Sequence, residues 1–553
     1  MTSPLQPEAL CGPRPAAAPL LPETTALRQF LDTASRLPSA AFIQYFDRTL
    51  TYAEADQLSS ALLAGLRAAG IATGDRVALF LQNDPDFAIA QLAAWKAGAV
   101  CVSINPMLRS QELRHVLTDS GSTFLVTLGD LWKGVAHAVV AETNVRTVLL
   151  AEPSSWTAAA PPLSRPIPSA PGVRVETIPA LLKEHAGAKP EFAPASLDDV
   201  ALLCYTSGTS GQPKGVISTH RNIACSAAAY RYWMSIDEHD VFLGGAPIFH
   251  VTGLIAGLAL AYCSGMSIVL FHRFDPSVCL QQTASHRATF TIMATTAFQS
   301  VVNHPDARPE AVESLTKVYS GGAPVTFAID SAWRKLTGRG IGNVYGLTET
   351  TGPTHAVPLG AEAPIDRETG AMAVGVPLPG VEARLVDPDR KTDVPTGEAG
   401  ELWIKGPMVM DGYWGLPEAT AQAFHDGYFR TGDVAVQDED GWYYVIDRLK
   451  DMINAAGYKV WPREVEEFLL QHPDIREASV VGVPDPYRGE SVKAFVVTSE
   501  ESRLTPQGVI EFAKGQMAAY KYPREVEIVD HLPKTASGKV LRRELRSRSV
   551  KDR

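Results

Sequence analysis

Short, largely apolar runs and amphipathic segments alternate along the first half of the chain. Leu58, Leu62 and Leu66 recur at helical spacing behind the capping box at 51–54, which predicts a helix that ends near Gly70. The largely apolar runs at 76–81, 99–104, 123–127 and 146–150 have the length of buried strands. Strands that alternate with helices predict a parallel sheet covered on both faces.

The pattern changes near residue 374. Between 374 and 445 short apolar runs are separated by turns that contain glycine, which predicts a compact β-rich subdomain. Beyond 447, strand-like runs at 478–483 and 492–497 lie between helical patterns and predict an α+β domain of about 100 residues. We therefore predict the α/β fold class, with a large N-terminal domain of parallel α/β sheets that carries the β-rich subdomain, and a small C-terminal α+β domain.

The predicted boundaries follow from these changes and from the length. The 553 residues exceed the size of one hydrophobic core, so at least two domains are expected. The first residues are rich in Pro and Ala, which is typical of disorder. The predicted parts are a disordered tail at 1–24, an N-terminal domain at 25–447 and a C-terminal domain at 448–553.

Charge and cysteine usage exclude some classes of protein. A formal net charge of −11 argues against a general nucleic-acid binder, which needs a basic face, so no nucleic-acid partner is expected. The six cysteines are scattered and form no C-x-x-C pair. That usage is typical of reduced thiols in a cytoplasmic protein and not of a disulfide framework or a zinc site.

One stretch, 251–271, carries no charge and is long enough to cross a bilayer. Tyr262-Cys263-Ser264-Gly265 interrupts it, so a buried helix at about 253–262 and a strand at 266–271 explain it better. The N-terminus lacks the basic start and apolar core of a signal peptide. We expect no integral membrane segment.

The segment from Tyr205 to Gly215 combines four Ser and Thr residues, three glycines and Lys214. Glycines let backbone N–H groups approach a ligand, and the hydroxyls and the lysine suit a polyphosphate. A surface linker would have a similar composition, but an apolar run at 200–203 enters this loop and a second strand-like run at 215–218 leaves it. Linkers seldom lie between two strands. The Walker A pattern is absent from the sequence, so this is a different phosphate loop.

This loop resembles the phosphate-binding signature of the adenylate-forming superfamily, which includes acyl-CoA synthetases, coumarate-CoA ligases, peptide-synthetase adenylation domains and beetle luciferases. Further segments resemble that superfamily in the same order along the chain: 247–253 (Pro-Ile-Phe-His-Val-Thr-Gly), 320–324 (Ser-Gly-Gly-Ala-Pro), 343–350 (Asn-Val-Tyr-Gly-Leu-Thr-Glu-Thr), 428–433 (Tyr-Phe-Arg-Thr-Gly-Asp), 447–451 (Asp-Arg-Leu-Lys-Asp), 454–460 (Asn-Ala-Ala-Gly-Tyr-Lys-Val) and 533–543 (Pro-Lys-Thr-Ala-Ser-Gly-Lys-Val-Leu-Arg-Arg). One motif is weak evidence, but the ordered set covers nearly the whole chain after about residue 30. The chain is therefore identified as similar to AMP-forming acyl-CoA synthetases.

The resemblance implies roles for named residues. Lys539 is the adenylation lysine, Glu349 holds Mg²⁺, and the hydroxyl of Thr348 binds phosphate. The implied ATP and AMP site comprises Thr206, Ser207, Gly208, Thr209, Ser210, Gly211, Lys214, Gly322, Ala323, Pro324, Asn343, Val344, Tyr345, Gly346, Leu347, Thr348, Asp433, Arg448 and Lys539. The implied acyl pocket comprises His250, Val251, Gly253, Leu254, Gly321 and Val344, and the implied CoA passage comprises Lys450, Ala456 and Gly457. Lys450 is also the implied hinge of a mobile C-terminal domain.

Structural interpretations of some of these residues stay open on the sequence alone. His250 beside apolar residues fits a structural histidine, Lys450 fits a linker charge, and Lys539 fits a solvated basic tail. Val344 departs from the resemblance, because many relatives have Gly at this position of the acyl pocket. The acyl group therefore does not follow from the resemblance, although the absence of an Arg beside Val344 disfavours a malonate-type diacid.

The implied activity has two steps. A carboxylic acid and ATP give an acyl-adenylate and pyrophosphate, and CoA then takes the acyl group and releases AMP. ATP, Mg²⁺ and coenzyme A are the implied cofactors and co-substrates. The alternatives are an acyl-AMP ligase that loads a carrier protein in a natural-product pathway, a luciferase-like oxygenase, and a nucleotide-binding interaction protein without activity. The sequence does not distinguish a monomer from a dimer.

Overall fold

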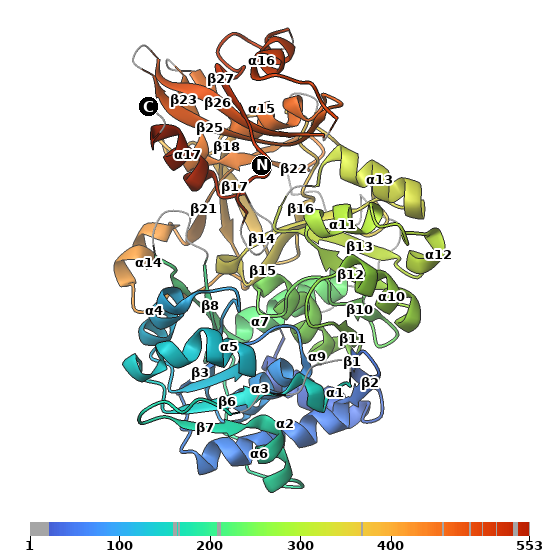
Figure 1. The fold of residues 1–553 in the computed structure, drawn as a ribbon, viewed down its shortest axis with the longest axis vertical. Coiled ribbons are helices and arrows are strands. Elements are labelled where there is room, and N and C mark those ends of the chain that lie inside the picture. The colour runs from blue at the N-terminus through green and yellow to red at the C-terminus, as the bar shows by residue number, and fades with distance from the viewer. Residues whose placement is uncertain are drawn as a thin grey trace.

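The computed structural model of this chain describes residues 22–158, 163, 166–206, 212–323, 325–366, 369–455, 458–485, 488–499, 501–515, 517–534 and 540–551. Within these residues, elements from the first part of the chain lie at one end of the molecule, coloured blue to cyan, and the C-terminal elements lie at the other end, coloured orange to red (Figure 1). The predicted tail lies outside the described residues as far as residue 21. Helix α1 (Ala26–Arg36) begins behind Thr25, whose side chain accepts a hydrogen bond from the Arg28 amide.

The first sheet has eight strands, and its central members are parallel. Their order is β19 (Gly412–Tyr413), β9 (Gly215–Thr219), β8 (Val200–Tyr205), β4 (Val100–Ser103), β3 (Arg76–Phe80), β5 (Phe124–Leu128), β6 (Thr147–Ala151) and β7 (Arg174–Thr177). The helices connected to these strands are α2 (Tyr52–Ala68), α3 (Pro85–Lys96), α4 (Ser110–Ser120), α5 (Gly129–Gly134) and α6 (Ile178–Glu184). The predicted capping box of α2 is present, and Asp84 caps α3 with Pro85 in its first turn.

The second sheet has nine strands and is parallel from β14 through to β1. Their order is β16 (Val376–Pro377), β15 (Gly352–Ala356), β14 (Gly342–Leu347), β13 (Lys317–Gly321), β12 (Phe290–Met293), β10 (Val241–Leu243), β11 (Ser267–Leu270), β1 (Ala41–Tyr45) and β2 (Arg48–Thr51). Its helices include α7 (His220–Trp233), α10 (Pro276–His286), α11 (Thr295–Val302), α12 (Pro309–Val312) and α13 (Phe327–Thr337).

The uncharged stretch at 251–271 is part of the main core. It forms α8 (Val251–Gly253), a π-helical segment (Leu254–Ala259), α9 (Leu260–Ser264) and strand β11. All six residues of the π-helical segment are buried. The predicted helix followed by a strand is therefore confirmed, although its middle part is wound as a π-helix. No helix among the described residues is long and apolar enough to span a membrane.

A third sheet is antiparallel and follows the two parallel sheets in the chain. It contains β17 (Glu382–Val386), β18 (Gly400–Lys405), β20 (Phe424–His425), β21 (Tyr428–Gln437) and β22 (Tyr443–Arg448), with α14 (Pro417–Ala423) beside it. Its buried side chains form a core cluster with residues of the neighbouring sheets. It occupies the position in the chain at which the sequence predicts a β-rich subdomain.

The C-terminal elements form a fourth sheet with its own core. Its strands are β23 (Ile453–Ala455), β24 (Tyr458–Val460), β25 (Ile475–Asp485), β26 (Gly489–Thr498) and β27 (Glu525–Ile528), and its helices are α15 (Pro462–Leu469), α16 (Pro506–Lys514) and α17 (Arg542–Lys551). Only the β26–β27 pair is parallel among the strand pairs described in this sheet. The predicted fold class, with large parallel α/β sheets and a small C-terminal α+β domain, is confirmed.

Candidate active site

Strands β8 and β9 hold the base of the predicted phosphate loop. They pair antiparallel as far as Tyr205 and Gly215, and the Thr206 amide donates to the Lys214 carbonyl oxygen at 3.0 Å. The Lys214 amide donates to Thr206 Oγ1 at 3.5 Å. Residues 207–211, with the other hydroxyls and glycines predicted to bind phosphate, lie outside the described residues. The segment is a hairpin loop closed at its base, which fits a ligand loop better than a linker.

The predicted Tyr-Gly-Leu-Thr-Glu-Thr motif turns sharply from β14 into a 3₁₀ helix at Thr348–Thr350. Gly346 allows this turn, because a Cβ atom there would lie 2.0 Å from the Gly352 carbonyl oxygen. Thr351 follows with a positive φ of 48°. Its hydroxyl lies 3.0 Å from that of Ser218 on β9. The turn is thereby tied to the strand that leaves the phosphate loop.

Glu349 is half-buried within this turn. Its backbone carbonyl accepts a hydrogen bond from the Met410 amide at 2.8 Å, and its Oε1 accepts one from the Tyr413 hydroxyl at 3.0 Å. The ring of the same Tyr413 carries Lys214 Nζ at 4.8 Å from its centroid. Tyr413 thus connects the predicted phosphate lysine with the predicted metal carboxylate.

Asp433 and Arg448 occupy paired positions on β21 and β22. Arg448 Nε lies 2.8 Å from Asp433 Oδ1, and the Tyr345 hydroxyl donates to Asp433 Oδ2 at 2.7 Å. Asp433 raises the pKa of the Arg448 guanidinium above its ordinary value, and burial followed by Asp433 raises the pKa of the Tyr345 hydroxyl. The Tyr345 ring lies 5.8 Å from the buried His355 ring. Three residues predicted for the nucleotide site are therefore linked through one carboxylate.

Two residues predicted for the acyl pocket lie opposite each other on β13 and β14. Gly321 pairs with Val344, and a Cβ atom on Gly321 would lie 3.2 Å from Val344 Cγ1. Next to them, Asn343 is buried, and its side chain accepts a hydrogen bond from the Val325 amide at 3.3 Å and donates one to the Ala373 carbonyl at 2.9 Å. The side chain of Asn343 therefore holds the loop after β13 in place. In this structure its amide group is hydrogen-bonded to the protein backbone.

That loop carries two further predicted nucleotide-site residues. Gly322 is exposed with φ of 83°, a backbone conformation that favours glycine, and Ala323 is half-buried. Pro324 lies outside the described residues.

The segment around His250 forms a tight turn into the π-helical segment. His250 Nδ1 accepts a hydrogen bond from the Thr252 amide at 3.3 Å and caps the first turn. A side chain on Gly253 would meet the Pro247 carbonyl oxygen at 2.3 Å, so the turn requires glycine. Two further predicted pocket residues belong to the same buried core cluster as Val344: Val251 and Leu254.

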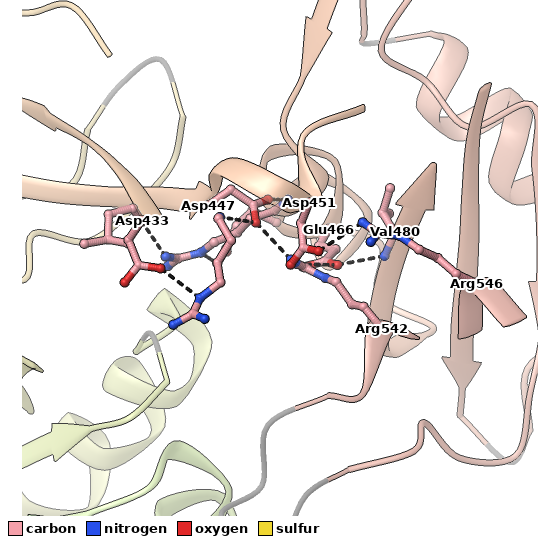
Figure 2. A network of polar contacts seen from close by, with 11 residues as sticks. Asp433, Asp447, Asp451, Glu466, Val480, Arg542 and Arg546 are labelled. Carbon is pink, nitrogen blue, oxygen red and sulfur yellow. Dashed lines mark hydrogen bonds and ion pairs between the residues drawn. The ribbon is translucent and has the colours of Figure 1, made fainter. Parts of the chain in front are cut away.

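The predicted hinge is surrounded by a network of charged side chains (Figure 2). Asp447 precedes the hinge and accepts hydrogen bonds from the Arg463 amide at 2.8 Å and from Arg542 Nη1 at 2.9 Å. Arg542 also donates to both carboxylate oxygens of Glu466 at 2.9 and 2.8 Å. Glu466, Asp447 and Asp451 raise the pKa of Arg542 against the lowering effect of burial.

Asp447 is therefore held by two residues that follow Lys450 in the chain, Arg463 and Arg542. Lys450 itself is exposed within the 3₁₀ helix Leu449–Asp451, and burial of part of the side chain and Arg448 lower its pKa. Three other residues of the prediction lie outside the described residues: Ala456, Gly457 and Lys539. Their predicted roles rest on the sequence motifs.

Two family models match this chain. The model described as AMP-binding enzyme matches residues 30–414, and the model described as AMP-binding enzyme C-terminal domain matches residues 464–539. The chain belongs to the AMP-binding enzyme family. The superfamily predicted from the motifs is thereby confirmed.

Relatives of this AMP-binding enzyme cover nearly its whole length. It is 36% identical over 513 residues to feruloyl-CoA synthase of Amycolatopsis sp., with 92% of this chain and 96% of that protein covered. It is 33% identical over 539 residues to a long-chain-fatty-acid–CoA ligase of Bacillus subtilis (strain 168), with 95% and 94% covered. Among solved structures, o-succinylbenzoate CoA synthetase from Bacillus subtilis, in complex with the acyl-adenylate intermediate OSB-AMP, is 29% identical with a TM-score of 0.79, covering 95% of this chain and 98% of that one.

The donors of the AMP-binding enzyme fit Mg²⁺, the metal that its family implies. Among the described residues no group of three or more His, Cys, Asp or Glu side chains gathers to hold a metal alone. Magnesium instead uses one or two carboxylates together with substrate phosphates and water. Glu349 provides such a carboxylate, because Tyr413 occupies Oε1 and Oε2 accepts no hydrogen bond from the other described residues.

Two parts of this arrangement were missed by reasoning from sequence. Tyr413 lies in a two-residue strand, and Arg542 lies far along the chain from Asp447. The aromatic pair in the Gly-Tyr-Trp sequence at 412–414 was the one sequence signal that could have indicated a role for Tyr413.

Proposed function

We propose that this AMP-binding enzyme is an acyl-CoA synthetase that activates a carboxylic acid with ATP and transfers the acyl group to CoA. The observation that carries the proposal is the convergence of Lys214, Glu349 and the Asp433–Arg448 pair, which come from three sheets. Tyr413 joins the first two, and Tyr345 joins the strand that leads to Glu349 with Asp433. A cation, a carboxylate and a ribose-binding acid are the groups that a nucleoside triphosphate requires.

In the first step a carboxylate oxygen of the acid attacks the α-phosphorus of ATP. A new P–O bond forms, the bond to the bridging oxygen of the β-phosphate breaks, and pyrophosphate leaves with its electron pair. Catalysis of such a transfer consists mostly of positioning and charge stabilisation. Magnesium, when bound, would neutralise phosphate charge, and Glu349 would hold it.

The protein groups have separate roles in this step. Lys214 and the loop that begins at Thr206 hold the β- and γ-phosphates. Asp433 accepts hydrogen bonds from the ribose hydroxyls while Arg448 and Tyr345 fix its orientation. Lys539 bridges the substrate carboxylate and the α-phosphate oxygens, a role that rests on its motif.

In the second step the CoA sulfur attacks the acyl carbonyl carbon. The C–S bond forms, the bond between that carbon and the AMP oxygen breaks, and AMP leaves while the thiol proton is lost. We propose that the C-terminal domain (448–553) rotates about Lys450 between the steps, against the N-terminal domain (25–447) and its β-rich part (374–445). Ala456 and Gly457 would then border the pantetheine arm, where a larger side chain would block passage.

The proposed substrate is an acid with an apolar acyl group. The described residues assigned to the pocket are apolar apart from His250, whose Nδ1 is used in the turn. The acyl groups in the relatives' names, a feruloyl and a long-chain fatty acyl group, both fit a largely apolar wall. We propose CoA as the acceptor because both relatives carry CoA in their names; a carrier-protein acceptor is the alternative.

The proposed location is the cytoplasm. The five cysteines among the described residues are free thiols, and four of them are buried. Reduced, unpaired cysteines fit a reducing compartment.

A mass-spectrometric assay with ATP, Mg²⁺ and a panel of fatty, aryl and polycyclic acids, with and without CoA, tests the proposal. We expect acyl-CoA and AMP for one class of acid, and acyl-AMP bound to the enzyme when CoA is left out. Acyl-AMP that accumulates and does not respond to CoA would favour a carrier-protein acceptor. The absence of both products with every acid would contradict the proposed function.

A further inference from the structure

Tyr413 lies beside the phosphate loop because of a long-range strand pairing. Strand β19 pairs antiparallel with β9, so that Tyr413 lies opposite Val216. The Trp414 amide donates to the Gly215 carbonyl at 2.7 Å. The backbone of Tyr413 is thus attached directly to the strand that begins after Lys214.

The segment that carries Tyr413 is also fixed on its other sides. The Tyr413 amide donates to Thr420 Oγ1 at 2.9 Å. Upstream, the Asn222 side chain on α7 donates to the carbonyls of Pro407 and Val409 at 2.9 and 3.0 Å. The position of the Tyr413 ring is therefore set by the backbone on both sides and by β9.

The side chain of Tyr413 contacts two groups of opposite charge. Its hydroxyl donates to Glu349 Oε1 at 3.0 Å, and its ring face carries Lys214 Nζ at 4.8 Å from the centroid. A phenol hydroxyl is a strong donor to a carboxylate, and an aromatic face attracts an ammonium group.

These contacts keep two charges apart and in fixed positions. Among the described residues, Lys214 and Glu349 form no direct ion pair, and each contacts Tyr413 instead. A direct pair would have to break before ATP could bind between them. The ring face retains the ammonium group by a weak contact, and the hydroxyl already orients one carboxylate oxygen.

We propose that Tyr413 is a positioning residue for adenylation, which orients Glu349 through its hydroxyl and retains Lys214 on its ring so that the pair receives magnesium-bound ATP. This inference rests on the proposed function, in which Glu349 and Lys214 bind the metal and the phosphates. In this proposal Tyr413 acts through Glu349 and Lys214, not on the acid or the reacting phosphorus. Supporting partners of a metal ligand typically change metal affinity by about 10- to 100-fold when they are removed.

Tyr413→Phe and Tyr413→Leu separate the two contacts. The Phe variant loses the hydroxyl and retains the ring over Lys214, whereas the Leu variant loses both. Calorimetric titration with ATP, without any acid and therefore without turnover, is run once with Mg²⁺ and once with EDTA. The ratio of the two dissociation constants measures what the metal contributes to binding, independently of activity.

We expect Tyr413→Phe to reduce the metal-dependent gain in ATP affinity by about tenfold and to leave binding in EDTA unchanged. Tyr413→Leu should also weaken binding in EDTA by about two- to fivefold, because Lys214 loses its aromatic contact. Tyr444→Phe on β22 is the matched control. It also removes a tyrosine hydroxyl that donates to a carboxylate, here that of Asp438 at 2.7 Å. It should leave both constants at wild-type values.

The Glu349→Gln variant distinguishes a failure of the Tyr413 proposal from a failure of the proposed function. Should Glu349→Gln abolish the metal-dependent gain while Tyr413→Phe retains all of it, the role of Tyr413 is refuted and the proposed function stands. Should Glu349→Gln retain the gain, the assignment of Glu349 in the proposed function is wrong and the Tyr413 proposal is overturned with it. Equal unfolding temperatures of wild type and Tyr413→Phe exclude a general loss of structure as the cause.

Discussion

Arg448 and Asp433 face each other across strands β22 and β21, with Arg448 Nε 2.8 Å from Asp433 Oδ1. Tyr345 donates to the other carboxylate oxygen of Asp433 at 2.7 Å. The acid assigned to the ribose is therefore preorganised before the nucleotide arrives, since both of its oxygens already have fixed partners. Each carboxylate oxygen has a second lone pair with which it can accept a ribose hydroxyl.

Replacement of this acid should weaken nucleotide binding. Asp433→Asn replaces a charged acceptor by a neutral one and removes the ion pair with Arg448. Because hydrogen bonds to charged groups are worth about 1.5–3 kcal/mol, we expect ATP affinity to fall by about tenfold or more. Calorimetric titration with Mg²⁺ and ATP measures this. Asp438→Asn in the turn between β21 and β22 is the control, and wild-type affinity in Asp433→Asn would refute the ribose assignment.

Lys539 should act in the first step alone. Lys539→Ala removes the cation that stabilises the charge that develops on the α-phosphate, so acyl-AMP formation should fall on the order of 100-fold or more. Conversion of supplied acyl-AMP to acyl-CoA should proceed at the wild-type rate. Lys534→Ala is the control, because Lys534 forms an ion pair with Glu477 at 2.8 Å within the C-terminal domain. Equal loss of both steps in Lys539→Ala would contradict the assignment.

Lys450 should act in the second step. Lys450→Pro fixes φ and removes the backbone N–H at the proposed pivot. We expect acyl-AMP formation close to wild type and thioester formation slowed at least several-fold, measured by rapid quench of each half-reaction. Lys450→Ala retains the backbone freedom, so it should leave acyl-AMP formation nearly unchanged and slow thioester formation less than Lys450→Pro does. Wild-type rates for both steps in Lys450→Pro would place the pivot elsewhere.

Val344 should limit the size of the acyl group. Its side chain lies beside Gly321, where an added Cβ atom would be 3.2 Å from Val344 Cγ1, so the two residues share one wall of the proposed pocket. Val344→Gly should raise kcat/KM for bulky acids relative to small ones by about tenfold, since one methylene in an apolar pocket discriminates at this level. Val344→Ile should shift the ratio in the opposite direction. An unchanged ratio in both variants would show that Val344 lies outside the acyl pocket.

Acid should destabilise the protein through the buried His355. Burial lowers the pKa of His355 from 6.5 to about 3. The unfolded chain therefore binds a proton between these values while the folded protein does not, so stability falls as the pH falls below 6.5. Between about pH 7 and about pH 5 this group should remove about 2 kcal/mol from the free energy of unfolding.

Urea unfolding of wild type and His355→Phe at both pH values isolates this contribution. The variant should lose about 2 kcal/mol less than the wild type on acidification, whatever its stability at neutral pH. The pH-dependent loss of stability must be compared between the two proteins, because Asp86 also titrates in this range. Burial raises the pKa of Asp86 to about 7, so this group stabilises the folded protein as the pH falls. Parallel pH profiles of the two proteins would contradict a buried neutral His355.

Much of the fold follows from local sequence pattern. The capping box at 51–54 and the apolar runs of the first sheet predict helices and strands correctly, because burial and helix capping are decided within a few residues. The exception is the segment after His250, where a π-helical turn at Leu254–Ala259 replaces part of the predicted helix. A π-helical turn depends on packing around Gly253 and on neighbouring elements, and hydrophobic pattern does not encode it.

The candidate site was predictable where a motif is continuous in sequence. Gly346 and Glu349 belong to one such motif, and the structure places them on one tight turn. The contacts of Tyr413 with Lys214 and of Arg542 with Asp447 join segments far apart in the chain. They depend on strand pairing and on the arrangement of domains, which no local pattern contains.

The most direct test of the account follows the oxygen atoms of the acid. The enzyme is supplied with an accepted acid whose carboxylate carries ¹⁸O at both oxygens, together with ATP, Mg²⁺ and CoA, and the released AMP is analysed by mass spectrometry. Attack of the carboxylate on the α-phosphorus predicts one ¹⁸O atom in each AMP, because thioester formation breaks the bond between the acyl carbon and that oxygen. Unlabelled AMP, or label in inorganic phosphate with ADP as product, would contradict activation through an acyl-adenylate.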